Sequence, residues 1–147
     1  MSPADAGPAA GLPMARCKRR LATVWFILSG LIFLLLVVQT VMGRYGDGAT
    51  DAWGWFLPNV MPTLSLIVAV LVLDQMGKGA RTGTADRFLF RLAISLSAAY
   101  LLLILLSILI QPFAALPPLQ LMQQSNLWLG PLQGLVAGAL GAFFIKT

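Results

Sequence analysis

Residues 21–42 read LATVWFILSGLIFLLLVVQTVM and contain no charged side chain. Three further uncharged runs follow, at residues 53–73, 92–110 and 127–145. Each run is close to the roughly 20 residues that a helix needs to cross the hydrocarbon core of a bilayer. Because hydrocarbon offers the backbone no hydrogen-bonding partner, such long and continuously apolar runs are expected to be helical. The pattern predicts an all-α integral membrane protein with four transmembrane helices.

The composition and the segments outside these runs fit the same organisation. Of the 147 residues, 59% are hydrophobic and 10% are charged, whereas about 25% are charged in soluble domains. We expect residues 1–19 to form a disordered basic cytoplasmic leader, because SPADAGPAAGLP has no hydrophobic periodicity. Residues 20–147 are expected to form the four-helix transmembrane domain. The proline-containing connection at residues 111–126 is expected to have little tendency to form a helix.

The distribution of positive charge predicts the orientation. Arg44 is the only basic residue in a connection on the predicted outer side. The other nine flank the opposite ends of the runs: Arg16, Lys18, Arg19, Arg20, Lys78, Arg81, Arg87, Arg91 and Lys146. Since Lys and Arg concentrate in short cytoplasmic flanks, both termini are expected in the cytoplasm of a bacterial cell, with the chain in its inner membrane. The expected partners are the lipid bilayer and other membrane proteins, and nucleic-acid binding is not expected.

A faint internal repeat relates the first two runs to the last two. Three pairs of matching positions are spaced by 71, 72 and 73 residues: Arg20-Leu21-Ala22 with Arg91-Leu92-Ala93, Gln39 with Gln111, and Trp55-x-x-Pro58 with Trp128-x-x-Pro131. This drift suggests two tandem helical hairpins inserted in the same orientation, as in transporters with parallel repeats. Convergence is the alternative, because aromatic residues belong at membrane interfaces and proline is tolerated at helix starts.

The outer half of the second run carries a candidate polar site. Its sequence WGWFLPNVMP places Pro58 and Pro62 one turn apart around Asn59. An interior proline frees the carbonyl four residues earlier, and broken helices line solute sites in some transporters. Pro131 and Gln133 occupy the related part of the fourth run. A structural kink with an interhelical hydrogen bond from Asn59 is the alternative that we favour.

Four tryptophans are expected to anchor the helices at the membrane interfaces, as aromatic residues commonly do: Trp25, Trp53, Trp55 and Trp128. Asp74 is the carboxylate closest to a run, at its inner boundary. We expect it to be hydrated or paired with Lys78 or Arg91, although a buried carboxylate in a membrane would be a functional candidate.

The fourth run contains a helix-packing motif, GPLQGLVAGALG. Gly130, Gly134 and Gly138 are four residues apart and Gly141 follows three later, so all four lie on one helix face. Tandem GxxxG in an apolar run marks a face that allows close helix association. The motif leaves open whether the partner helix lies in the same chain or in another copy. Gln133 beside this face is expected to bond to the partner helix or to line a pore.

The sequence contains no set of residues that is typical of a catalytic or cofactor-binding site. It has no histidine, no glutamate and a single cysteine, Cys17, so metal, redox and general-base sites of the usual kinds are not expected. The leading hypothesis is a non-enzymatic membrane component that self-associates or binds a partner, as a pore, membrane effector or anchor subunit. The alternative is a small solute or ion transporter with its site at the kinked outer halves of the second and fourth helices.

Overall fold

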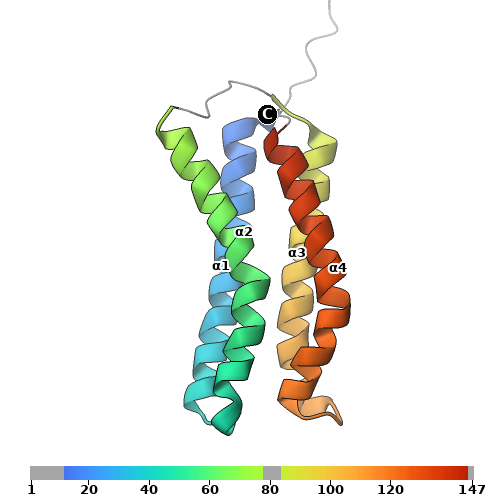
Figure 1. Ribbon diagram of the computed structural model, residues 1–147. Coiled ribbons are helices and arrows are strands. Elements are labelled where there is room, and N and C mark those ends of the chain that lie inside the picture. Colours follow the sequence, from blue (N-terminus) through green and yellow to red (C-terminus); the bar gives the residue numbers. More distant parts are fainter. Residues whose placement is uncertain (1–11, 78–83, 146–147) are drawn as a thin grey trace, which may run out of the picture.

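The computed structural model describes residues 12–77 and 84–145, and these form an elongated bundle of four long helices (Figure 1). The helices are α1 (Met14–Val41), α2 (Ala49–Gln75), α3 (Arg87–Leu109) and α4 (Pro118–Ile145). All four are long and apolar enough to cross a membrane. The prediction of four apolar helices is therefore confirmed, and the fold is compatible with a multi-pass membrane protein.

Short elements connect the helices. The 3-10 turns η1 (Gly46–Gly48) and η2 (Gln111–Phe113) precede α2 and α4. At the other end of the bundle, β1 (Leu12–Pro13) pairs antiparallel with β2 (Thr84–Ala85). This pairing ties the segment before α1 to the segment before α3, so the two parallel helices start beside each other.

Local sequence explains where several helices begin and end. Gly43 has a φ of 73°, which closes α1 with bonds from the amides of Gly43 and Arg44 to the carbonyls of Thr40 and Gln39. Asp86 caps α3, because its carboxylate accepts a 2.9 Å hydrogen bond from the Phe88 amide. Both signals lie outside the apolar runs. Gly43 ends α1 directly after its run, and Asp86 starts α3 a short distance before its run.

Two predicted boundaries differ from the structure. Residues 14–19, which the sequence places in a disordered leader, form the first turns of α1, since a helical backbone can continue past the end of an apolar run. The remainder of the predicted leader up to residue 11 lies outside the described residues. The prediction of little helix at residues 111–126 is also wrong, because α4 begins at Pro118. Proline is well tolerated at the first position of a helix, where its missing amide has no helical acceptor.

The helices form a square in which α1 packs against α2 and α3, and α4 packs against α3 and α2. Helices at corresponding positions of the faint repeat, α1 with α3 and α2 with α4, are therefore neighbours. Large buried side chains fill the interior, among them Trp25, Phe56, Tyr100 and Phe143. The outer surface carries many exposed leucines, isoleucines, valines and phenylalanines, as expected where lipid replaces water as the solvent.

Candidate functional site

The glycine face of α4, which we define as Gly130, Gly134, Gly138 and Gly141, lies on the side of the helix away from the bundle. Gly130, Gly134 and Gly138 are exposed, and Gly141 is half-buried. A Cβ atom added at any of the four would meet no neighbouring atom within 4 Å. The side of α4 that faces the bundle is instead made of larger residues, such as Leu129, Val136, Leu140 and Phe143. Within the described chain, close packing between helices does not use the glycine face.

Gln133 connects α4 to the proline-containing part of α2. Its Nε2 donates a 3.3 Å hydrogen bond to the backbone carbonyl of Pro58. This carbonyl is the one that Pro62, four residues later, leaves without its usual helical donor. The glutamine therefore replaces the missing amide. The Gln133 side chain therefore bonds to α2 of its own chain and does not extend across the glycine face.

Asn59 lies at the centre of a buried hydrogen-bond network. The Tyr100 hydroxyl donates to Asn59, with its oxygen 2.9 Å from the backbone carbonyl and 3.1 Å from the side-chain oxygen. The Asn59 amide nitrogen donates in turn to the Trp55 carbonyl at 2.6 Å. The Trp55 indole donates to Ser125 at 3.0 Å, and Ser125 donates to the Met122 carbonyl.

This network joins α2 to both α3 and α4, because Tyr100 belongs to α3 and Ser125 to α4. Both the oxygen and the nitrogen of the Asn59 side chain have partners, and the Trp55 indole has one as well. A buried polar group without a partner costs on the order of 1–3 kcal/mol, so the satisfied network favours a structural role for Asn59. The structure brings Pro58, Asn59, Pro62 and Gln133 together, while Pro131 is exposed on α4.

The four predicted tryptophan anchors fall into different environments. Trp25 is fully buried, and its ring lies 6.2 Å from that of Tyr100. Trp55 is also buried, and its indole takes part in the network just described. Trp53 is half-buried and bonds to Thr40 at 3.1 Å, and Trp128 is 45% exposed. Trp25 and Trp55 are therefore core residues and not anchors, because neither indole can reach head groups from inside the bundle.

Asp74 pairs with a residue that the sequence did not indicate. Its carboxylate lies 2.8 Å from the Lys18 ammonium group, and both side chains are partly buried. Lys18 is in the first turns of α1, within the segment predicted to be disordered, so the pairing depends on the early start of that helix. Of the two expected partners, Lys78 lies outside the described residues, and the Arg91 side chain is exposed. The ion pair joins the first turns of α1 to the last turn of α2.

A second polar cluster closes the opposite end of the bundle, where η1 and η2 lie. The Tyr45 hydroxyl donates to the side-chain oxygen of Gln39 at 2.6 Å and lies 3.5 Å from that of Gln111. The same Gln111 oxygen accepts from Arg44 Nε at 3.2 Å. Burial raises the pKa of Tyr45 above its ordinary value, although the positive charge of Arg44 acts in the opposite direction. The hydroxyl is therefore protonated and available as a donor at neutral pH.

The sequence contains a partial signal for this second cluster. Gln39 and Gln111 are a matching pair in the faint repeat, and the structure brings both amides to one tyrosine. Tyr45 itself carries no signal, because a single tyrosine in a glycine-rich turn is expected to be solvated. Hydropathy alone could not show that the turn folds back over the end of the bundle.

Within residues 12–77 and 84–145, no group of three His, Cys, Asp or Glu side chains could hold a metal ion. No family model, curated protein or solved structure matches the chain.

Proposed function

We propose that the protein is a non-enzymatic membrane scaffold that self-associates through the glycine face of α4. The supporting observation is that the three exposed glycines meet no atom of their own chain where a Cβ would stand. A helix face that is smooth, apolar and unused inside the chain allows the backbone of a second helix to approach closely. Association in a bilayer depends on such packing, since lipid is as apolar as leucine and provides no hydrophobic driving force.

The outer end of the same face carries amides suited to such a contact. Gln123 and Asn126 precede Gly130 by seven and four residues, so both lie on its side of the helix. Both side chains are exposed. Amide groups can hydrogen-bond between helices, with each contact worth on the order of 1 kcal/mol in membranes. Two copies related by a twofold axis along the membrane normal would place these amides opposite each other.

Among the roles compatible with self-association, an anchor or scaffold is favoured over a pore. The interior of the bundle is filled by Trp25, Phe56, Tyr100 and other large side chains. The glycine face would close by direct backbone contact, which leaves no polar wall for a water path between copies. The transport alternative finds no comparable support, because Asn59 and Gln133 both have partners within the chain.

The proposal includes an orientation with both termini in the cytoplasm of a bacterial inner membrane. The described ends of the chain lie at the same end of the bundle as the end of α2 and the start of α3 (Figure 1). The described part of this end carries six basic residues: Arg16, Lys18, Arg19, Arg20, Arg87 and Arg91. Alkaline phosphatase fused after residue 147 or before residue 1 should be inactive, and fused within the η1 turn it should be active. Activity of the two terminal fusions would contradict this orientation.

Crosslinking in lipid tests the self-association. The wild-type chain should form crosslinked dimers in vesicles, and the double variant Gly134→Ile/Gly138→Ile should weaken the association by about tenfold, equivalent to about 1.4 kcal/mol. Ala69→Ile on the exposed side of α2 is a matched control, because it adds similar bulk away from α4. A wild-type chain that stays monomeric, or a double variant that associates as strongly as the wild type, would disprove the proposal.

A further inference from the structure

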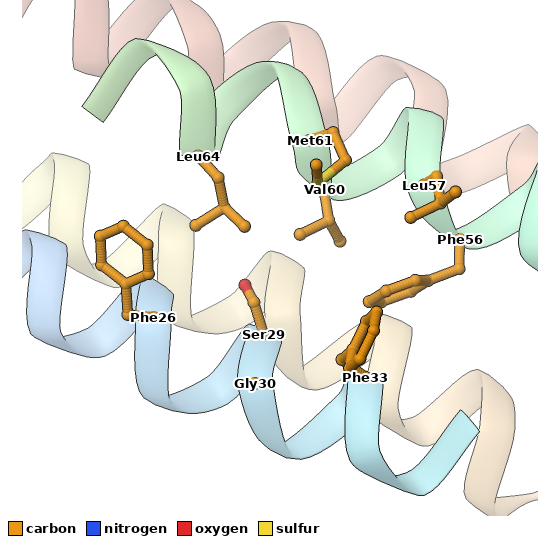
Figure 2. Close-up of a pocket in the computed structure, with 9 residues that line it drawn as sticks. All are labelled: Phe26, Ser29, Gly30, Phe33, Phe56, Leu57, Val60, Met61 and Leu64. Atoms are coloured by element: carbon orange, nitrogen blue, oxygen red, sulfur yellow. The ribbon is translucent and has the colours of Figure 1, made fainter. Parts of the chain in front are cut away.

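A groove of about 150 Å³ lies between α1 and α2 (Figure 2). Its walls are apolar and include three phenylalanine rings, those of Phe26, Phe33 and Phe56. Leu57, Val60, Met61 and Leu64 of α2 complete the opposite side. Phe26 and Phe33 are each 45% exposed, so the groove is open to the surroundings of the bundle and is not a closed cavity.

One polar group lies in this apolar groove. The Ser29 side chain projects from α1 toward α2, into the space between the two helices (Figure 2). The residue is only 3% exposed, and its hydroxyl has no hydrogen-bond partner in the described chain. The structure thus places an unpartnered donor and acceptor among aromatic and aliphatic side chains.

The depth of Ser29 makes water an unsuitable partner. Ser29 lies close to the middle of α1, which runs from Met14 to Val41. At the middle of a membrane-spanning helix, the groove opens toward hydrocarbon and not toward solvent. An acyl chain could fill the groove but would leave the hydroxyl unpaired, which costs on the order of 1–3 kcal/mol.

We propose that the groove binds a membrane-soluble six-membered aromatic or quinonoid ring that carries an oxygen on its edge, with this oxygen hydrogen-bonded to Ser29. A cavity of this size in an apolar protein core accommodates a single benzene ring. The three phenylalanines supply faces and edges for aromatic packing. A phenol and a quinone share this chemistry, since the oxygen of either can accept a hydrogen bond from a serine hydroxyl. The site lies on different helices from the proposed self-association face and does not depend on it.

Gly30 keeps the groove open. Phe26, Gly30 and Phe33 follow each other at spacings of four and three residues, so they share one face of α1. A Cβ added at Gly30 would meet no atom within 4 Å. A larger side chain at this position can therefore occupy the groove without moving the helix backbone.

Two fluorinated probes that differ in a single group test the proposal. The full-length protein in lipid nanodiscs is titrated with 4-fluorophenol and with 4-fluorotoluene, and binding is followed by fluorine NMR. Empty nanodiscs provide the correction for partitioning into lipid. The wild type should bind the phenol about fivefold more tightly than the toluene, the size expected for one neutral hydrogen bond.

Three variants assign the binding to the groove. Ser29→Ala should reduce the preference for the phenol to less than about twofold while keeping the affinity for the toluene. Gly30→Leu should abolish binding of both probes. Ser95→Ala, which removes an exposed serine from α3, should behave as the wild type. Circular dichroism of each variant checks that its helical content is retained.

The wild-type measurement can overturn the proposal without any variant. Equal affinity for the two probes would mean that Ser29 takes no part and that the groove holds only hydrocarbon, such as a lipid chain. Binding of neither probe above the empty nanodiscs would exclude a ring site. Retained binding in Gly30→Leu would place the ring elsewhere on the protein and would also refute the assignment.

Discussion

The side-chain amide of Gln133 bonds to the backbone carbonyl of Pro58 at 3.3 Å, and Pro62 is the reason that this carbonyl is free. A break in the hydrogen-bonding of α2 is thus repaired by a residue of α4, 75 positions away. In hydrocarbon such a repair matters, because no water can replace the missing donor. The proline and the glutamine form one structural unit, and this unit can be tested by removing either member.

Replacing Gln133 with Leu should lower the free energy of unfolding by about 1 kcal/mol, the size of an interhelical hydrogen bond in membranes. In a Pro62→Ala background, Gln133→Leu should lower the free energy of unfolding by less, because an alanine at position 62 supplies the backbone amide that bonds to the Pro58 carbonyl. Unfolding in mixed micelles of the wild type, the two single variants and the double variant gives the coupling energy. An equal cost of Gln133→Leu in both backgrounds would show that the two residues are independent.

Removal of the Tyr100 hydroxyl should destabilise the bundle. Tyr100→Phe leaves the volume of the core nearly unchanged but takes away the donor that bonds to Asn59. We expect a loss of about 1 kcal/mol in the free energy of unfolding, measured as thermal unfolding by circular dichroism in detergent. Ser95→Ala, which removes an exposed hydroxyl from the same helix, should have little effect. A Tyr100→Phe variant as stable as the wild type would argue against the network.

Breaking the Lys18–Asp74 ion pair should loosen the start of α1. Asp74→Asn removes the charge that holds Lys18 against α2, and amide hydrogen exchange in residues 14–20 should become faster. The effect on global stability is expected to be small, about 1 kcal/mol or less, because the pair is partly exposed. Arg19→Met, which removes an exposed cation in the same turn, should not change the exchange. Unchanged exchange in Asp74→Asn would contradict the assigned pair.

Trp25 and Trp128 should respond differently to quenchers in the bilayer. Brominated lipids should quench a chain that keeps only Trp128 strongly, because this side chain is 45% exposed. A chain that keeps only Trp25 should be quenched weakly, since Trp25 is fully enclosed by the bundle. The other tryptophans are replaced by phenylalanine in both chains, and helical content is checked before quenching. Equal quenching of the two would show that α1 does not pack as described.

Hydropathy was sufficient to predict the four helices, because the length and continuity of an apolar run are local properties. The starts of α1 and α4 were predicted less well. A helix can begin before its apolar run, as α1 does at Met14, and a proline can start a helix, as Pro118 does. Both effects depend on the backbone, and an average of side-chain hydrophobicity therefore does not detect them.

Composition and spacing also singled out residues of unusual size or polarity: the glycines of α4, the two prolines and Asn59 of α2, and the tryptophans. Which of these residues come into contact depends on how the helices pack. The helical repeat places residues on a face, but the rotation of each helix about its axis is set by packing against its neighbours. That rotation turns Trp25 and Asn59 into the core, brings Gln133 to Pro58, and leaves the glycine face of α4 directed away from its own bundle.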